Sequence, residues 1–217
     1  MKKVIGVGAG GHAKVIIEIL TQSGGFKIVG LLDNKKELLN SRILDLPVLG
    51  GDELLPKLYN EGLRYAFVGL GSVGNSNPRR ELYENVQQNG FEIVQAIHPS
   101  ANISSSVEIG EGATIMAAVV INACTHIGQN VIINTGSIIE HDCDIRDHVH
   151  IASGAVLAGG ITVNEGAHIG LGAKLLQGIK IGKNAIIGAG SVVLNDVEPD
   201  MVVVGNPAKE LRNRADS

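Results

Sequence analysis

The segment IIEHDCDIRDHVHIASG, residues 138–154, holds three histidines and four acids, whereas the residues around it are mostly small, apolar or glycine. A histidine next to an acid, as in His141-Asp142, can move a proton near pH 7, because the carboxylate stabilises the charge that forms on the ring. Several histidines close together could instead bind a metal ion. The simplest alternative is a solvated turn, which is how we interpret Glu140, Asp144, Arg146, Asp147 and His148.

A repeat of six residues must position this segment. Stepping by six from Ile97 to Val193, all seventeen positions hold isoleucine, leucine or valine. This period is typical of a β-helix, in which each hexad supplies one short strand and one corner of a triangular prism. Glycine often follows the aliphatic residue, as at Gly110, Gly170 and Gly188, and we expect these glycines to form corners with positive φ.

Residues 1–95 alternate apolar strands with helices, which predicts a small Rossmann-like α/β domain with a parallel sheet before the β-helix of residues 96–217. The turn GAGGHA at residues 8–13 fits the loose pattern G-x-G-x-x-A, whose amides can hold a phosphate at a helix start. The region is about half as long as a full dinucleotide-binding domain, which favours a mononucleotide or sugar nucleotide over NAD. We expect the ligand to contact Gly10, Gly11, His12 and Asp33.

Composition limits the partners. A formal net charge of −4 and a pI near 6.0 give no electrostatic reason to expect a nucleic acid or an acidic membrane. The two cysteines, Cys124 and Cys143, are too few for a disulfide framework. Glycines interrupt the N-terminal apolar run, and no stretch approaches the roughly 20 apolar residues of a membrane span. We therefore expect a cytoplasmic protein.

Together these features resemble the bacterial nucleotide-sugar acetyltransferases with a left-handed parallel β-helix of hexapeptide repeats, a family of the sialic acid O-acetyltransferase type. The resemblance covers essentially the whole chain and rests on GAGGHAKV, LLDN, VLGGDELL, IIEHDC with HVHIASG, the hexads and VVVGNPAK. It implies an N-acetyltransferase that uses acetyl-CoA, without a metal, to acetylate the 4-amino group of a nucleotide-linked sugar in surface polysaccharide or glycan biosynthesis.

The resemblance also implies roles. His141 would be the general base, Asp142 would increase its basicity, and His150 would lie at the acetyl group. An amine that attacks a thioester must lose a proton, and a neutral imidazole suits this step. A second donor could hold the thioester oxygen as it gains charge. Glu140 also flanks His141, and the sequence leaves open which of the two acids orients the ring.

Further residues match family positions near the two substrates. Pantetheine would follow coil corners near Gly170-Leu171 and Gly188-Ala189, with Lys209 available to the CoA phosphates. Asn34 and Gly51 would lie near the nucleotide. The sugar and its carrier stay open, because uridine, guanosine and thymidine carriers use similar loops.

Three alternatives from other classes stay open. One is O-acetylation of a sialic acid, in which the acceptor is a hydroxyl. Another is a zinc enzyme like the γ-class carbonic anhydrases, which share the β-helix but pair two zinc-binding histidines five residues apart. That spacing is absent among the histidines of the β-helix region, of which we interpret His126 and His168 as lining. The third is a non-catalytic binder of sugar nucleotides.

Finally, spacing favours a homotrimer. One coil takes about 18 residues, so His141 and His150 lie half a turn apart and point in different directions on a single prism. Three prisms around a threefold axis would bring such side chains together in clefts between chains, and flat, loop-free walls suit a closed cyclic interface. The family resemblance points the same way.

Overall fold

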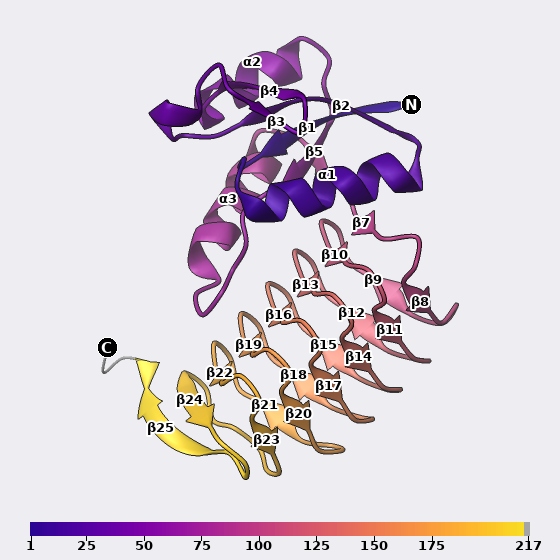
Figure 1. The fold of residues 1–217 in the computed structure, drawn as a ribbon, viewed down its shortest axis with the longest axis vertical. Helices are drawn as coiled ribbons and strands as arrows, with labels where there is room; N and C mark the ends of the chain where they lie inside the picture. Colours follow the sequence, from indigo (N-terminus) through magenta and orange to yellow (C-terminus); the bar gives the residue numbers. More distant parts are fainter. Residues whose placement is uncertain (215–217) are drawn as a thin grey trace.

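The computed structural model describes residues 1–214 and consists of an α/β part followed by a β-helix (Figure 1). The α/β part has a six-stranded sheet of order β3-β4-β2-β1-β5-β6, parallel except where β3 joins β4. Its elements are β1 (Lys2–Val7), α1 (Gly11–Ser23), β2 (Phe26–Leu32), η1 (Lys36–Leu38), β3 (Arg42–Ile43), β4 (Leu46–Gly50), η2 (Asp52–Leu54), α2 (Leu55–Asn60), β5 (Tyr65–Val68), α3 (Asn77–Gln88) and β6 (Glu92–Ile93). This confirms the predicted Rossmann-like sheet.

The β-helix has three parallel sheets, one on each side of the prism. Each strand pairs with the strand one coil, or 18 residues, further on, as Thr114 does with Ile132. The first sheet contains β7 (Ala96–Ile97), β10 (Thr114–Ile115), β13 (Ile132–Ile133), β16 (His150–Ile151), β19 (His168–Ile169) and β22 (Ile186–Ile187), and the hairpin of β24 (Met201–Val204) and β25 (Lys209–Asn213) extends it.

The other two sheets complete the prism. The second sheet contains β8 (Asn102–Ile103), β11 (Val120–Ile121), β14 (Ile138–Ile139), β17 (Val156–Leu157), β20 (Lys174–Leu175) and β23 (Val192–Val193). The third contains β9 (Glu108–Ile109), β12 (His126–Ile127), β15 (Asp144–Ile145), β18 (Thr162–Val163) and β21 (Lys180–Ile181). The hexapeptide β-helix predicted from the sequence is confirmed.

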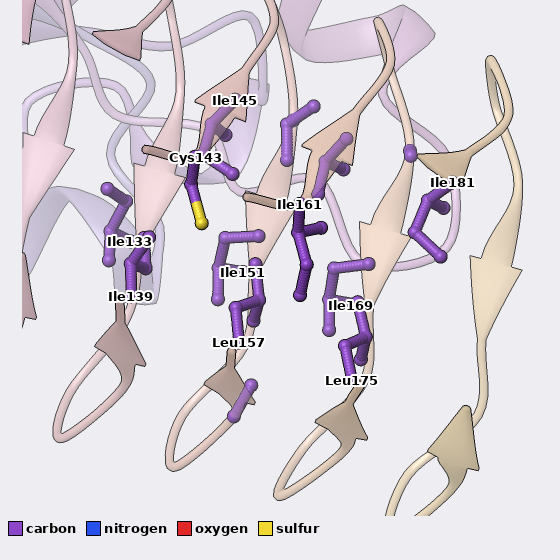
Figure 2. Packing of buried hydrophobic residues seen from close by; sticks show 14 of the residues in the cluster. Ile133, Ile139, Cys143, Ile145, Ile151, Leu157, Ile161, Ile169, Leu175 and Ile181 are labelled. Carbon is purple, nitrogen blue, oxygen red and sulfur yellow. The ribbon is translucent and has the colours of Figure 1, made fainter. Parts of the chain in front are cut away.

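The aliphatic repeat fills the interior of the prism (Figure 2). From Ile115 to Val193 every sixth residue is buried, and full burial of such a side chain contributes about 1.5–3 kcal/mol. We call the residues of this repeat the ladder. Small buried residues such as Cys143 and Ala155 stand two positions before a ladder residue and leave room for it. Ile97, Ile103 and Ile109 are only partly buried because they form the first coil, which has a neighbouring coil on one side only.

The corners differ from the expectation in one respect. Residues with positive φ stand three positions after the ladder residue, as at Cys124, Asp142 and His148, and not directly after it. The glycines directly after the ladder are required by close packing instead. A Cβ on Gly110 would lie 2.5 Å from the backbone of Gly128, and one on Gly170 would lie 2.5 Å from the carbonyl oxygen of Ile187.

The α/β part packs on the first coils, as Figure 1 shows. Residues of α1 share one apolar cluster with Ala96, Met116 and Ile132 of the β-helix. The segment leading into α3 reaches further along the prism, where Ser76 Oγ donates to the carbonyl oxygen of Gly166 at 3.4 Å. The predicted division at residue 95 falls between β6 and β7 and stays a prediction.

Cys124 and Cys143 are free thiols.

Candidate active site

The His141-Asp142 pair lies at the corner that follows β14. Asp142 Oδ2 is 2.7 Å from His141 Nδ1, so the ring donates from Nδ1 and its Nε2 carries the lone pair. Asp142 has a φ of 58°, which turns its carboxylate back beside the preceding ring. The His141 side chain is 56% exposed and that of Asp142 is 64% exposed. The corner therefore presents an exposed, hydrogen-bonded imidazole whose Nε2 has no partner among the described residues.

Two neighbours shape this corner. One coil further along, Gly159 leaves space for the ring, and a Cβ there would lie 2.6 Å from His141 Cε1. Gly160 donates its backbone N–H to the His141 carbonyl oxygen at 2.9 Å. Glu140 is held elsewhere, because its Oε2 accepts a hydrogen bond from Asn122 Nδ2 at 2.8 Å. Asp142, rather than Glu140, is thus the acid that contacts His141 in this chain.

A second feature is a cavity of about 490 Å³ at the carboxyl ends of the parallel strands of the α/β part. It is lined by Gly8, Gly10, Asp33, Asn34, Lys35, Asp52, Gly69, Leu70 and, from α3, Pro78, Glu81, Leu82 and Asn85. An adjoining hollow contains Gly51 together with Asp33 and Asn34. Four of the six residues predicted to bind the nucleotide therefore lie together here, whereas Gly11 and His12 are not among the lining residues.

Asp33 fixes the glycine turn at the edge of this cavity. Its Oδ2 accepts the backbone N–H of Ala9 at 2.8 Å, and its Oδ1 accepts that of Lys35 at 3.0 Å. Gly8 has a φ of 97° and lies so near Gly69 that a Cβ would be 3.0 Å from that backbone. Asp33 thus holds the turn in an open conformation at the start of α1, where Gly10 lines the cavity. Backbone N–H groups at such a helix start can bind a phosphate.

Asn34 and Asp52 form the neighbouring wall. The Asn34 Nδ2 donates to Asp52 Oδ2 at 2.9 Å, and Asn34 Oδ1 accepts the backbone N–H of Asp52 at 3.0 Å. Burial raises the pKa of Asp52, and the nearby charges of Glu53 and Asp33 raise it further, while the Asn34 hydrogen bond opposes them. The wall offers an amide and a carboxylate to the hydroxyl or N–H groups of a ligand.

His12 and His150 lie instead at the junction between the α/β part and the β-helix. His150 is 4% exposed, and its Nδ1 lies 3.3 Å from the carbonyl oxygen of Ser72. Burial lowers the pKa of His150 to about 4, with His168 and Arg79 adding to the effect. Burial also lowers the pKa of His12 to about 3, helped by the charge of Arg79 and by His150. Both rings are neutral near pH 7.

Other histidines pack around this junction. The His168 ring stands edge-on to that of His150 with centroids 4.9 Å apart, which agrees with a lining role. His148 differs from the solvated corner predicted for it. Its ring is half-buried and edge-on to Tyr83 of α3, with centroids 5.8 Å apart, because α3 lies against this corner. Burial lowers the pKa of His148.

Apart from His150, the residues predicted to hold acetyl-CoA lie at the C-terminal coils. Gly170 stacks on the next corner, where a Cβ would be 2.7 Å from the backbone nitrogen of Ala189. A Cβ on Gly188 would be 2.7 Å from Val204, which pairs with Lys209 across the hairpin. Leu171 is 59% exposed. The structure thus places these corners and Lys209 along one end of the prism.

Arg79 and Ser72 of the junction went unnoticed in the sequence. Arg79 stands in NPRRELYENV, where two adjacent arginines at a helix start are typical of a solvated surface. Arg79 is buried between the chain after β5 and the β-helix, where it donates to the carbonyl oxygens of Val68, Leu70 and Asn130, and no short motif signals these contacts. Within residues 1–214 there is no group of three or more His, Cys, Asp or Glu side chains that could hold a metal ion. The same residues include no helix long and apolar enough to cross a membrane.

Comparison with known proteins supports two family matches. Residues 3–86 match the PglD N-terminal domain, and residues 124–159 match the bacterial transferase hexapeptide (six repeats). A curated relative, UDP-N-acetylbacillosamine N-acetyltransferase of Bacillus subtilis, is 38% identical over 122 residues, which cover 54% of this chain and 52% of that protein. That match therefore spans about half of the relative's length.

Solved structures match over nearly the whole chain. PerB from Caulobacter crescentus, in complex with CoA and GDP-perosamine, is 40% identical with a TM-score of 0.90, and the match covers 98% of each chain. A variant of the GDP-perosamine N-acetyltransferase from the same organism, with a histidine replaced by alanine, has also been solved with both molecules. The acetyltransferase domain of PglB from Neisseria gonorrhoeae, in complex with acetyl coenzyme A, is 36% identical with a TM-score of 0.89, covering 97% of this chain and 99% of that one.

Proposed function

Because the chain belongs to the bacterial nucleotide-sugar N-acetyltransferases that carry a left-handed β-helix, we propose that it transfers the acetyl group of acetyl-CoA to the 4-amino group of a nucleotide-linked amino sugar. The relatives named above act on amino sugars or bind CoA and GDP-perosamine, which supports both substrates. We also propose that the protein works in the cytoplasm.

The observation that carries this proposal is the His141-Asp142 pair. With Nδ1 bound to Asp142, Nε2 of His141 is the nitrogen that accepts a proton. The amine nitrogen attacks the thioester carbon, a C–N bond forms, and the C–S bond breaks. His141 takes the proton that the amine loses and passes it to the CoA thiolate. Asp142 stabilises the imidazolium between these two transfers.

The nucleotide half of the substrate would bind in the cavity of the α/β part. Backbone N–H groups of the glycine turn and the start of α1 suit a diphosphate. Asp33, Asn34 and Asp52 suit the ribose and base, which offer hydroxyl and N–H donors. Acetyl-CoA would run along the corners at Gly170-Leu171 and Gly188-Ala189, with the exposed Lys209 meeting its phosphates.

We further propose that the active site forms between two chains of a homotrimer. Among the described residues, all those that line the nucleotide cavity lie between Gly8 and Asn85, and none comes from the β-helix of the same chain. The proposed base, His141, is exposed at a corner of the β-helix, where a neighbouring chain can reach its Nε2. A second copy that lays its nucleotide cavity against this corner would complete the site.

An assay of thiol release from acetyl-CoA tests the reaction, with UDP-, GDP- and dTDP-linked 4-amino sugars as acceptors. The matched control replaces the 4-amino group of the same sugar by a hydroxyl. Release with one of the amino sugars and none with the hydroxyl sugar would support N-acetylation. Activity only with free or CMP-linked sialic acid would overturn it in favour of O-acetylation. Binding of the sugar nucleotide without any transfer would show a non-catalytic binder.

A further inference from the structure

Arg79 is a buried cation at the junction of the two parts of the protein. It is 2% exposed, and no carboxylate within residues 1–214 forms an ion pair with it. Its Nη1 donates to the carbonyl oxygens of Val68 and Leu70 at 2.9 and 2.6 Å, and its Nε donates to that of Asn130 at 3.5 Å. Burying a guanidinium costs free energy, and these carbonyls compensate for part of the lost water, since Nη2 is buried without a partner within residues 1–214.

These contacts join three places in the fold. Val68 ends β5, and Leu70 lines the nucleotide cavity. Asn130 belongs to a corner of the β-helix, one coil before His148. Because an arginine presents its donors in a rigid planar fork, it can fix the direction of the chain after β5 relative to the coils. Two residues beyond Leu70, the chain delivers the carbonyl oxygen of Ser72 to His150.

The Ser72 contact determines how His150 carries its proton. A carbonyl oxygen only accepts, so Nδ1 of His150 must carry the hydrogen of this bond. In the neutral ring Nε2 is then an acceptor, and it is buried without a partner within residues 1–214. A donor role for His150 toward the thioester oxygen would need the other tautomer or a charged ring. Within residues 1–214, the charged or titratable groups that act on His150 are His12, His168 and Arg79, and none of these is an acid.

We infer that Arg79 is a positioning residue: by holding the chain after β5, it keeps the Ser72 carbonyl on His150 Nδ1 and leaves His150 Nε2 as a hydrogen-bond acceptor. Burial and the Arg79 charge both keep the pKa of His150 low, which preserves this state near pH 7. The tautomer itself does not rest on the proposed function, whereas the effect on turnover that is tested below does.

The tautomer can be read directly in the unaltered protein. Long-range ¹H–¹⁵N spectra of histidine-labelled protein distinguish protonated from unprotonated ring nitrogens, and a His150→Gln variant assigns the signals. We expect a protonated Nδ1 and an unprotonated Nε2 on His150, unchanged from pH 7.5 to pH 5.5. A protonated Nε2, or titration of this ring between those pH values, would overturn the inference. This result would hold whether or not the protein acetylates any sugar tested.

Variants of Arg79 test its role as a positioning residue. In Arg79→Lys the charge stays but the fork is lost, and Arg79→Gln removes both. We expect kcat to fall by about 10–100-fold in each, because small errors of placement have such effects, together with mixed tautomers at His150. The control is Arg80→Gln, whose partly buried arginine pairs with Glu165, and its kcat should stay within about twofold. An unchanged His150 spectrum and a normal kcat in Arg79→Lys would contradict the inference.

Discussion

The ring of His141 lies over Gly159, one coil further along the prism, in space that only a glycine leaves free. A Cβ at residue 159 would come within 2.6 Å of His141 Cε1 and within 2.8 Å of its Nε2. Real side chains do not approach this closely, so the glycine determines where the proposed base can stand. The two residues are 18 positions apart in the sequence, and no short motif contains both.

Gly159→Ala should therefore displace the imidazole without damaging the core. We expect kcat to fall by about 10–100-fold while the melting temperature changes little, because the added methyl group meets the exposed ring of His141 and not the core. The control is Gln177→Ala, which changes the same position of the next coil and should leave kcat unaltered. Measuring kcat together with thermal unfolding checks both expectations. A variant that keeps normal turnover would show that the ring need not lie over residue 159.

Asp33→Asn should weaken binding of the nucleotide sugar and spare acetyl-CoA. The carboxylate accepts two backbone N–H groups that hold the glycine turn, and an amide can replace only one of these acceptors. Loss of a hydrogen bond to a charged group corresponds to about 10-fold or more in affinity. Calorimetry with each substrate separates the two effects, and Asp45→Asn on an exposed turn is the control. Weaker binding of acetyl-CoA alone would place the cofactor in this cavity.

Acid should destabilise the protein through its buried neutral histidines. The pKa of His150 is lowered to about 4 by burial, His168 and Arg79, whereas in the unfolded chain it returns to its ordinary value near 6.5. Between these values the unfolded state binds protons that the folded state does not, so the free energy of unfolding falls as the pH falls. For His150 this loss reaches about 2 kcal/mol at pH 5.

Denaturant unfolding of His150→Gln at pH 7.5 and pH 5 measures this contribution. The variant should lose less stability than the unaltered protein over this interval, because glutamine does not titrate. His98→Gln serves as the control, since His98 lies at the edge of the first coil and its burial is only partial. Equal losses in all three proteins would mean that His150 is not held neutral by the fold.

Mixing two inactive variants tests the shared site. His141→Asn and His150→Gln would be dissociated and reassembled together. If the two residues meet between chains, a random mixture should regain about a quarter of the normal activity, because that share of interfaces receives both native residues. Native mass spectrometry verifies the mixed trimers. Mixed trimers without activity would place both residues in one chain's site, and a monomer in solution would exclude the arrangement altogether.

The prism could be predicted from the sequence because each side of each coil places one aliphatic residue in the core. This geometry produces an uninterrupted period of six residues. The sequence also predicted the place of Asp33 and Asn34, since loops after parallel strands meet at one edge. The conformation of the corners differs from the prediction, because glycine serves two needs there: close stacking at Gly170 and positive φ elsewhere. Arg79 could not be predicted, because its burial depends on a contact between segments 51 residues apart.

The most direct test of the account compares the unaltered protein with His141→Asn, using acetyl-CoA and the best nucleotide-linked amino sugar. Asparagine keeps a donor near Asp142 but cannot take the proton of the attacking amine. We predict that kcat falls by about 10²–10⁴-fold while the KM for acetyl-CoA changes little, because the loss concerns proton transfer and not binding. Turnover near that of the unaltered protein would contradict the assignment of His141 as the base.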